Sequence, residues 1–174
     1  RDSNPHIVKL WRTVEKAAIT AIKTGRSITI QQGIVIGYRW GMLLITLPSG
    51  RTICYPRTEV GIETNDGWRG DHEIIEYEGL NQKTKKWGKL RTYGGKLTEN
   101  IVQATARDIL GCVILGAERR GLNVVFRMHD GIFVEATKDQ ALQVVEAWFS
   151  EPMPWCRDLP LKGAGYTTPY YLKD

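Results

Sequence analysis

The chain has 174 residues, of which 42% are hydrophobic and 25% are charged, and its formal net charge is +5. This length suits one compact domain with a sizeable core, and the composition is that of an ordinary globular protein. No apolar run approaches the roughly 20 residues that a membrane-spanning helix needs, so no membrane partner is expected. The polar start at Arg1 has no signal-peptide pattern, which favours a cytoplasmic location.

Charge and cysteine content leave several function classes open. The pI near 9.2 permits a polyanionic partner without requiring one. Cys54, Cys112 and Cys156 are far apart in the sequence and form no close pair of the kind that binds a metal. We expect them to be buried free thiols in a reducing compartment.

The first third of the chain is predicted to form a helix followed by a β-meander. Asn4 and Pro5 suit the start of a helix, and apolar residues then recur at helical spacing as far as Gly25. Alternating patterns and turn residues next predict four short strands, at residues 27–31, 34–39, 43–47 and 51–55. Residues 60–72 are expected to form an irregular loop.

A basic segment follows, with two expected strands at residues 73–78 and 85–92. Several cations surround one aromatic residue there: Lys83, Lys85, Lys86, Lys89 and Arg91 around Trp87. One interpretation is a solvated charged face. The other is a strand that follows a phosphate backbone, because cations beside an aromatic side chain suit nucleic acid.

The longest periodic segment is predicted to be a helix over residues 97–120, after Gly94-Gly95 and before Gly121. Its polar residues Glu99, Gln103 and Arg107 stand at i, i+4 and i+8, which places them on one stripe.

Two apolar runs then flank a polar tripeptide, which predicts a tight β-hairpin with His129 and Asp130 at its tip. Gly131 is expected to supply the backbone freedom of that turn. A helix capped at Thr137 and a last strand near residues 161–166 complete the expected elements. Together, the expected elements predict an α+β fold. It has a small antiparallel sheet backed by two helices, at 97–120 and 138–150, with an N-terminal helix and a β-meander.

Three groups of residues together resemble the C-terminal palm region of family A DNA polymerases, and the phage branch related to bacterial DNA polymerase I is the most similar. The first group runs from Thr92-Tyr93-Gly94-Gly95-Lys96-Leu97 into Glu99-Asn100-x-x-Gln103. The second is His129-Asp130, about two dozen residues later, and the third is Pro154-Trp155, Leu159-Pro160-Leu161 and Gly165-Tyr166. The resemblance implies a helix following the fingers at residues 1–26, a meander with a basic extended segment at 27–92, and a palm core at 93–174.

In that family, the residue matching Asp130 is one of two carboxylates that hold two Mg²⁺ ions for nucleotidyl transfer. Hard oxygen ligands suit Mg²⁺, and paired ions stabilise both the attacking and the leaving oxygen. The resemblance also implies that His129 lies beside the primer terminus.

Further contacts with primer–template DNA are implied along the preceding helix. Gln103 matches a glutamine that reaches the minor groove, where acceptors occur at every base pair. Lys96, Asn100 and Arg107 are additional candidates for nucleic-acid binding.

Two departures from the family pattern matter. The third residue of the signature is acidic in the family and is Gly131 here. The chain also lacks a strand carrying the first carboxylate and a fingers helix that binds the incoming dNTP. We therefore expect a partner chain with the fingers and the remaining palm, in a bacterial cell or a phage-infected host. The expected function is the C-terminal palm portion of a template-directed DNA polymerase.

Alternative interpretations remain open. Taken alone, His129 and Asp130 could merely end a hairpin, and Gln103 and Arg107 could be ordinary helix-surface residues; the joint spacing of the motifs favours the polymerase. A second alternative is a non-catalytic DNA-binding or scaffolding remnant, in which Gly131 marks decay. A third is an unrelated hydrolase that uses an acid pair, Glu76/Glu78 or Asp66/Asp71.

Overall fold

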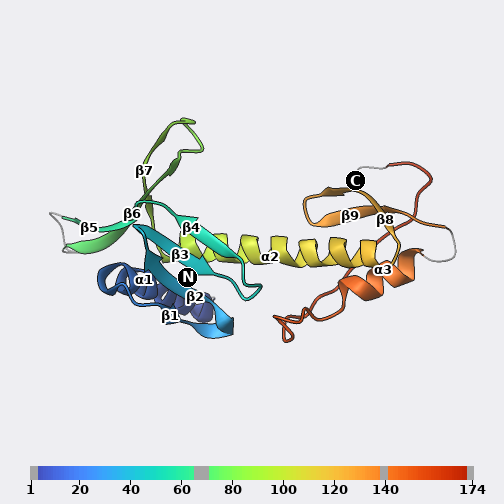
Figure 1. Cartoon of the computed structure of the whole chain (residues 1–174), viewed down its shortest axis with the longest axis horizontal. Coiled ribbons are helices and arrows are strands. Elements are labelled where there is room, and N and C mark those ends of the chain that lie inside the picture. Colours follow the sequence, from blue (N-terminus) through green and yellow to red (C-terminus); the bar gives the residue numbers. More distant parts are fainter. Residues whose placement is uncertain (1–3, 65–70, 138–140, 172–174) are drawn as a thin grey trace. The chain divides into compact units, whose positions relative to one another are not determined.

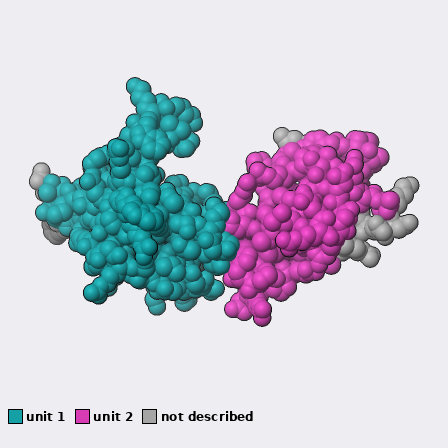
Figure 2. All heavy atoms as spheres, in the orientation of Figure 1, with its two compact units in different colours: residues 1–105 teal, residues 106–174 magenta. Residues whose placement is uncertain are grey.

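The structure is a computed structural model that describes residues 4–64, 71–137 and 141–171. The chain divides into two compact units, Arg1–Thr105 and Ala106–Asp174 (Figure 2). The fold is α+β, as predicted, and the described residues form three antiparallel sheets. No helix within the described ranges combines the length and the apolar character that crossing a membrane requires.

Helix α1, Pro5–Thr24, opens the first unit (Figure 1). It ends where predicted, because Gly25 has φ 68° and its N–H donates to the carbonyl of Ala21 at 2.8 Å. Asn4 precedes the helix, but its side chain makes no capping hydrogen bond. The predicted helix is therefore confirmed, with glycine rather than asparagine contributing the observed cap.

The predicted β-meander is also confirmed. Its strands are β1 (Ile28–Thr29), β2 (Val35–Arg39), β3 (Met42–Thr46) and β4 (Thr52–Tyr55), and they are antiparallel neighbours in that order. The small residues Ala18 and Ala21 of α1 are fully buried in one cluster with Ile36 and Ile45 of the sheet. The apolar face of α1 is thus covered by the chain's own sheet.

A second sheet contains β5 (Glu59–Glu63), β6 (His72–Leu80) and β7 (Trp87–Thr92), with β6 in the centre. The expectation of an irregular loop over residues 60–72 is wrong for its first part, since β5 pairs with β6 and Val60 lies opposite Ile75. The alternation of β5 is hidden by Gly61, which carries no side chain to mark the period. Residues 65–70 of the expected loop lie outside the described part of the chain.

Helix α2, Gly94–Arg119, begins three residues before the predicted start and includes both glycines. Gly94 lies where α2 meets α1: a Cβ atom there would be 2.0 Å from the carbonyl oxygen of Trp11. The N–H of Gly94 donates to the Glu15 carboxylate at 3.1 Å. This glycine is required by the close approach of two helices, whereas the sequence pattern placed it before the helix.

The second unit contains the C-terminal half of α2, the hairpin of β8 (Asn123–Met128) and β9 (Gly131–Glu135), and α3 (Ala141–Phe149). Val113, Trp148 and Met153 form its buried core, and Ile132 of β9 packs against them. The two helices therefore back the small sheet, as predicted.

Three smaller expectations for this unit and for the thiols need correction or fall outside the structure. Residues 161–166 form no strand, and a cap at Thr137 would lead into residues 138–140, which lie outside the described part. The three thiols are free, but Cys54 is exposed and the other two are only partly buried. Cys54 belongs to a short strand whose alternate side chains face solvent.

Candidate functional site

The β8–β9 hairpin presents His129 and Asp130 in a two-residue turn, because Met128 pairs directly with Gly131. The predicted hairpin is thus confirmed, and both turn side chains are exposed. Such a short connection fixes the turn residues relative to the two strands.

The backbone strain of this turn is at His129 and not at Gly131. His129 has φ 49°, whereas neither Asp130 nor Gly131 has a positive φ. A positive φ at the first turn position alone is typical of a type II′ turn, where glycine usually stands. The expectation that Gly131 supplies the freedom is therefore wrong. A residue other than glycine in this conformation costs roughly 1–3 kcal/mol, and such residues concentrate at functional sites.

Asp130 makes no hydrogen bond or ion pair with the residues that the structure describes. An exposed, unpaired carboxylate on a tight turn is a suitable ligand for a hard cation. The described part of the chain contains no cluster of three or more His, Cys, Asp or Glu residues that could hold a metal ion. Asp130 therefore fits Mg²⁺ as one ligand of a set that needs further oxygens.

Aromatic side chains hold the hairpin in place. The rings of Phe126 and Phe133 stack with centroids 4.2 Å apart, and Tyr171 meets each edge-on at 5.4 and 5.3 Å. A bulge at Val125 interrupts the ladder just before this stack. Bulges bend a strand and re-aim its side chains, and they are frequent beside active sites.

An open pocket of about 720 Å³ lies beside the hairpin within the second unit. Asp130 is part of its lining, together with β9, α3 and the segment at residues 162–171. The charged residues of the lining are Asp130, Glu135, Glu146 and Lys162. Asp130 thus borders a hollow large enough for a ligand.

Lys96 and Gln103 lie in the first unit, on the exposed side of α2, and Glu99 connects them. One oxygen of Glu99 accepts a hydrogen bond from Lys96 Nζ at 2.9 Å, and the other accepts one from Gln103 Nε2 at 3.2 Å. The ion pair raises the pKa of Lys96 above its usual value. Sequence reasoning placed Glu99 on the stripe but missed its positioning role, although the i, i+4 spacing to Gln103 is the signal for it.

The Asn100 side chain contacts Tyr55, at the end of β4. Its Nδ2 donates to the Tyr55 hydroxyl at 2.8 Å, in a partly buried contact. Burial raises the pKa of Tyr55 despite this hydrogen bond. Within the chain, Asn100 thus joins α2 to the end of β4.

Arg107 is exposed on α2 and belongs to the second unit, as do His129 and Asp130, whereas Lys96, Asn100 and Gln103 belong to the first. The candidate residues therefore form two groups. Each group has a defined geometry within its own unit.

The acid pairs that a hydrolase would use have structural partners. Glu76 pairs with Arg91 at 3.3 Å, and Glu78 pairs with Arg57 at 3.0 Å. Asp71 is exposed, and Asp66 lies outside the described residues. These contacts favour a solvated, ion-paired sheet face over a hydrolytic site.

Comparison with known proteins gives a similarity that extends along the entire chain. The chain is 40% identical over 175 residues to the DNA polymerase of Bacillus phage SP02, and the match covers 100% of the chain and 26% of that protein. The chain therefore spans about a quarter of the length of the curated relative that it matches. No family model matches the chain, and no solved structure matches it.

Proposed function

We propose that this chain is a portion of a DNA polymerase, and more specifically the C-terminal part of a family A palm. The observation that carries the proposal is the 40% identity, along the whole chain, to the DNA polymerase of a phage. The strained turn at His129 and Asp130 supports the proposal. It exposes an unpaired carboxylate, and the His-Asp signature of the family needs a carboxylate that is free to bind a metal ion.

Asp130 is the proposed metal ligand of this chain. When bound, two Mg²⁺ ions would supply electrostatic stabilisation of the attacking 3′-oxygen and the leaving pyrophosphate. Asp130 contributes one hard oxygen ligand, and a second carboxylate must come from sequence outside residues 1–174. The curated relative is nearly four times as long as this chain, which leaves ample sequence for that carboxylate and for the dNTP-binding fingers.

Primer–template DNA is the proposed partner of the remaining site residues. His129, on the same turn as Asp130, would hold the primer end. Gln103, held by Glu99, would place an amide in the minor groove, where acceptors occur at every base pair. Lys96 and Arg107 are exposed cations suited to phosphates, and Asn100 would act by fixing α2 against Tyr55.

The proposal is tested by Asp130→Asn in the complete polymerase, with Asp158→Asn as the matched control. Both variants make the same substitution at an exposed aspartate of the second unit, but Asp158 lies in the loop after α3 and does not line the pocket beside the hairpin. A bound metal ion supplies several kcal/mol of transition-state stabilisation, and about 1.4 kcal/mol is a tenfold change in rate. We therefore expect kcat for primer extension to fall at least about a hundredfold in Asp130→Asn and to change less than about twofold in Asp158→Asn.

Equal rates for wild type and Asp130→Asn would refute the metal role. Primer extension by the 174-residue chain alone would refute the need for an outside carboxylate. Retained primer–template binding by a complete wild-type protein that never extends a primer would support the second candidate, a non-catalytic DNA-binding or scaffolding remnant. The observation that favours this alternative is Gly131, which stands where the family signature has an acid.

A further inference from the structure

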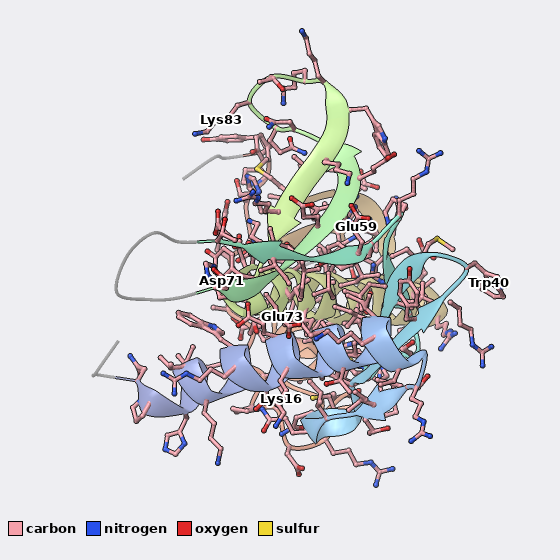
Figure 3. The ribbon with its side chains drawn as sticks, turned by 90° about the vertical axis from the view of Figure 1, so that its left-hand side faces the viewer. Lys16, Trp40, Glu59, Asp71, Glu73 and Lys83 are labelled. Carbon is pink, nitrogen blue, oxygen red and sulfur yellow. The ribbon has the colours of Figure 1, made fainter. Side chains whose placement is uncertain are left out.

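The hairpin of β6 and β7 projects from the rest of the first unit (Figure 1). We call residues 80–87, which end this hairpin, the arm tip. Figure 3 places Lys83 at the outer end of the hairpin and Glu59 near its base. The function proposed above uses no residue of the arm tip.

Charge is distributed differently along the hairpin and at its tip. On the strands, cations have acidic partners: Lys89 pairs with Glu59, and Arg91 Nη1 lies 2.5 Å from Glu63. The arm tip contains no acidic residue. Its three lysines, Lys83, Lys85 and Lys86, are exposed and have no ion-pair partner among the described residues.

The backbone that carries these lysines has a fixed conformation. The side-chain oxygen of Asn81 accepts hydrogen bonds from the N–H groups of Lys83 at 2.9 Å and Thr84 at 3.1 Å. The backbone of Asn81 exchanges further bonds with Lys85 and Lys86, at 2.8 and 2.9 Å. Lys85 takes a positive φ of 55° to close the loop. Three like charges are thus held on one ordered turn, and an anion bound there would relieve their mutual repulsion.

Trp87 adds an aromatic surface that is held in place at its polar edge. The residue is 64% exposed, and its Nε1–H donates to Glu78 at 3.2 Å. Arg57 holds the same carboxylate with two contacts, at 3.0 and 3.1 Å. These bonds from Trp87 and Arg57 lower the pKa of Glu78, so the carboxylate stays charged and keeps the ring edge anchored.

We propose that the arm tip binds single-stranded nucleic acid, with a base stacked on Trp87 and phosphates paired with the three lysines. Cations beside an exposed ring are the combination that binds unpaired strands without reading sequence, because every base has a stacking face. A duplex offers phosphates but no free base for the ring, so the exposed indole favours the single strand. The inference rests on the proposed function for its substrate, since a polymerase handles an unpaired template.

The test titrates the 174-residue chain with a fluorescein-labelled oligothymidylate at several salt concentrations. The variant Lys83→Gln/Lys85→Gln/Lys86→Gln is compared with Lys9→Gln/Arg12→Gln/Lys16→Gln on α1. The second variant removes the same charge from another exposed surface, on which Figure 3 labels Lys16. Each phosphate contact to a single strand contributes about 0.7 to the slope of log K against log salt. We expect the arm-tip variant to lower the slope by about 2 and the α1 variant to leave it unchanged.

Two substitutions of Trp87 separate stacking from a structural role. Trp87→Phe keeps a ring and loses the bond to Glu78, whereas Trp87→Leu loses the stacking face. We expect the oligothymidylate affinity of Trp87→Phe to stay within about threefold of that of the wild type, and that of Trp87→Leu to fall about tenfold. Circular dichroism confirms that each variant is folded.

Two results with the wild-type chain would overturn the proposal: no binding by the folded chain, or a duplex that binds as well as the single strand. Two results with the variants would also overturn it: equal salt slopes for the two triple variants, or equal losses of affinity in Trp87→Phe and Trp87→Leu. The assay contains no primer, metal or dNTP, so its outcome is independent of primer extension. Binding without extension in the complete protein would refute the proposed polymerase function alone. Extension without arm-tip binding would refute this inference alone.

Discussion

At the scale of single residues, the turn at His129 and Asp130 is the most informative feature of the molecule. The sequence predicted the hairpin and its tip, because two apolar runs flank a short polar segment. The sequence could not show which residue carries the backbone strain, since a glycine directly after His129-Asp130 suggests that glycine takes the positive φ. Pairing of Gly131 with Met128 instead puts Gly131 in the strand.

That correction makes an acid at position 131 physically possible. A Cβ atom at Gly131 would lie 3.6 Å from the carbonyl oxygen of Met128, an ordinary contact, and the backbone φ is not left-handed. We expect Gly131→Glu to fold and to lower the Mg²⁺ concentration for half-maximal primer extension severalfold in the complete polymerase. The added carboxylate would stand next to Asp130 and strengthen attraction for the cation.

Gly131→Gln is the matched control, because it has nearly the same size without the charge. Both substitutions give the strand a side chain and should stabilise it slightly. The same Mg²⁺ dependence for Glu, Gln and wild type would mean that position 131 lies away from the metal.

At the scale of elements, the sequence predicted the helices and most strands but not why certain glycines occur. Hydrophobic periodicity reports the inward face of an element and says little about how closely its neighbour approaches. Gly94 was predicted to precede the helix, yet it is the first residue of α2, at a place where the backbone of α1 leaves no space for a side chain. Gly61 similarly hid the alternation of β5.

Gly116 and Gly111 of α2 provide a matched pair for this point. A Cβ atom at Gly116 would lie 1.7 Å from Cζ2 of Trp148, whereas one at Gly111 would meet nothing within 4 Å. We expect Gly116→Ala to lower the free energy of unfolding by about 1–3 kcal/mol, because Trp148 must move from the core. Gly111→Ala should raise it by about 0.5–1 kcal/mol through helix propensity.

Urea unfolding of the two variants followed by circular dichroism measures both changes. Equal effects of the two substitutions would contradict the contact between α2 and α3. Trp148 is also covered by the Arg120 guanidinium, 3.4 Å from the ring centroid, so its fluorescence gives a second local signal.

At the scale of the whole molecule, the two units explain how far sequence reasoning could go. The α+β class and the meander followed from periodicity, and the candidate residues followed from a family resemblance. The division of those residues between two units did not follow, because α2 is one uninterrupted helix through the boundary. The two proposed binding surfaces, the β8–β9 turn and the arm tip, both lie on hairpin ends, where periodicity carries no signal.

The most direct test of the central claim is the position of a bound divalent ion. The complete polymerase would be crystallised with primer–template, dNTP and Mn²⁺ in place of Mg²⁺, and the ions located by their anomalous scattering. We expect a Mn²⁺ peak within about 2.3 Å of an Asp130 carboxylate oxygen, shared with a second acid from outside residues 1–174. Ions bound at the primer terminus without Asp130 among their ligands would contradict the account.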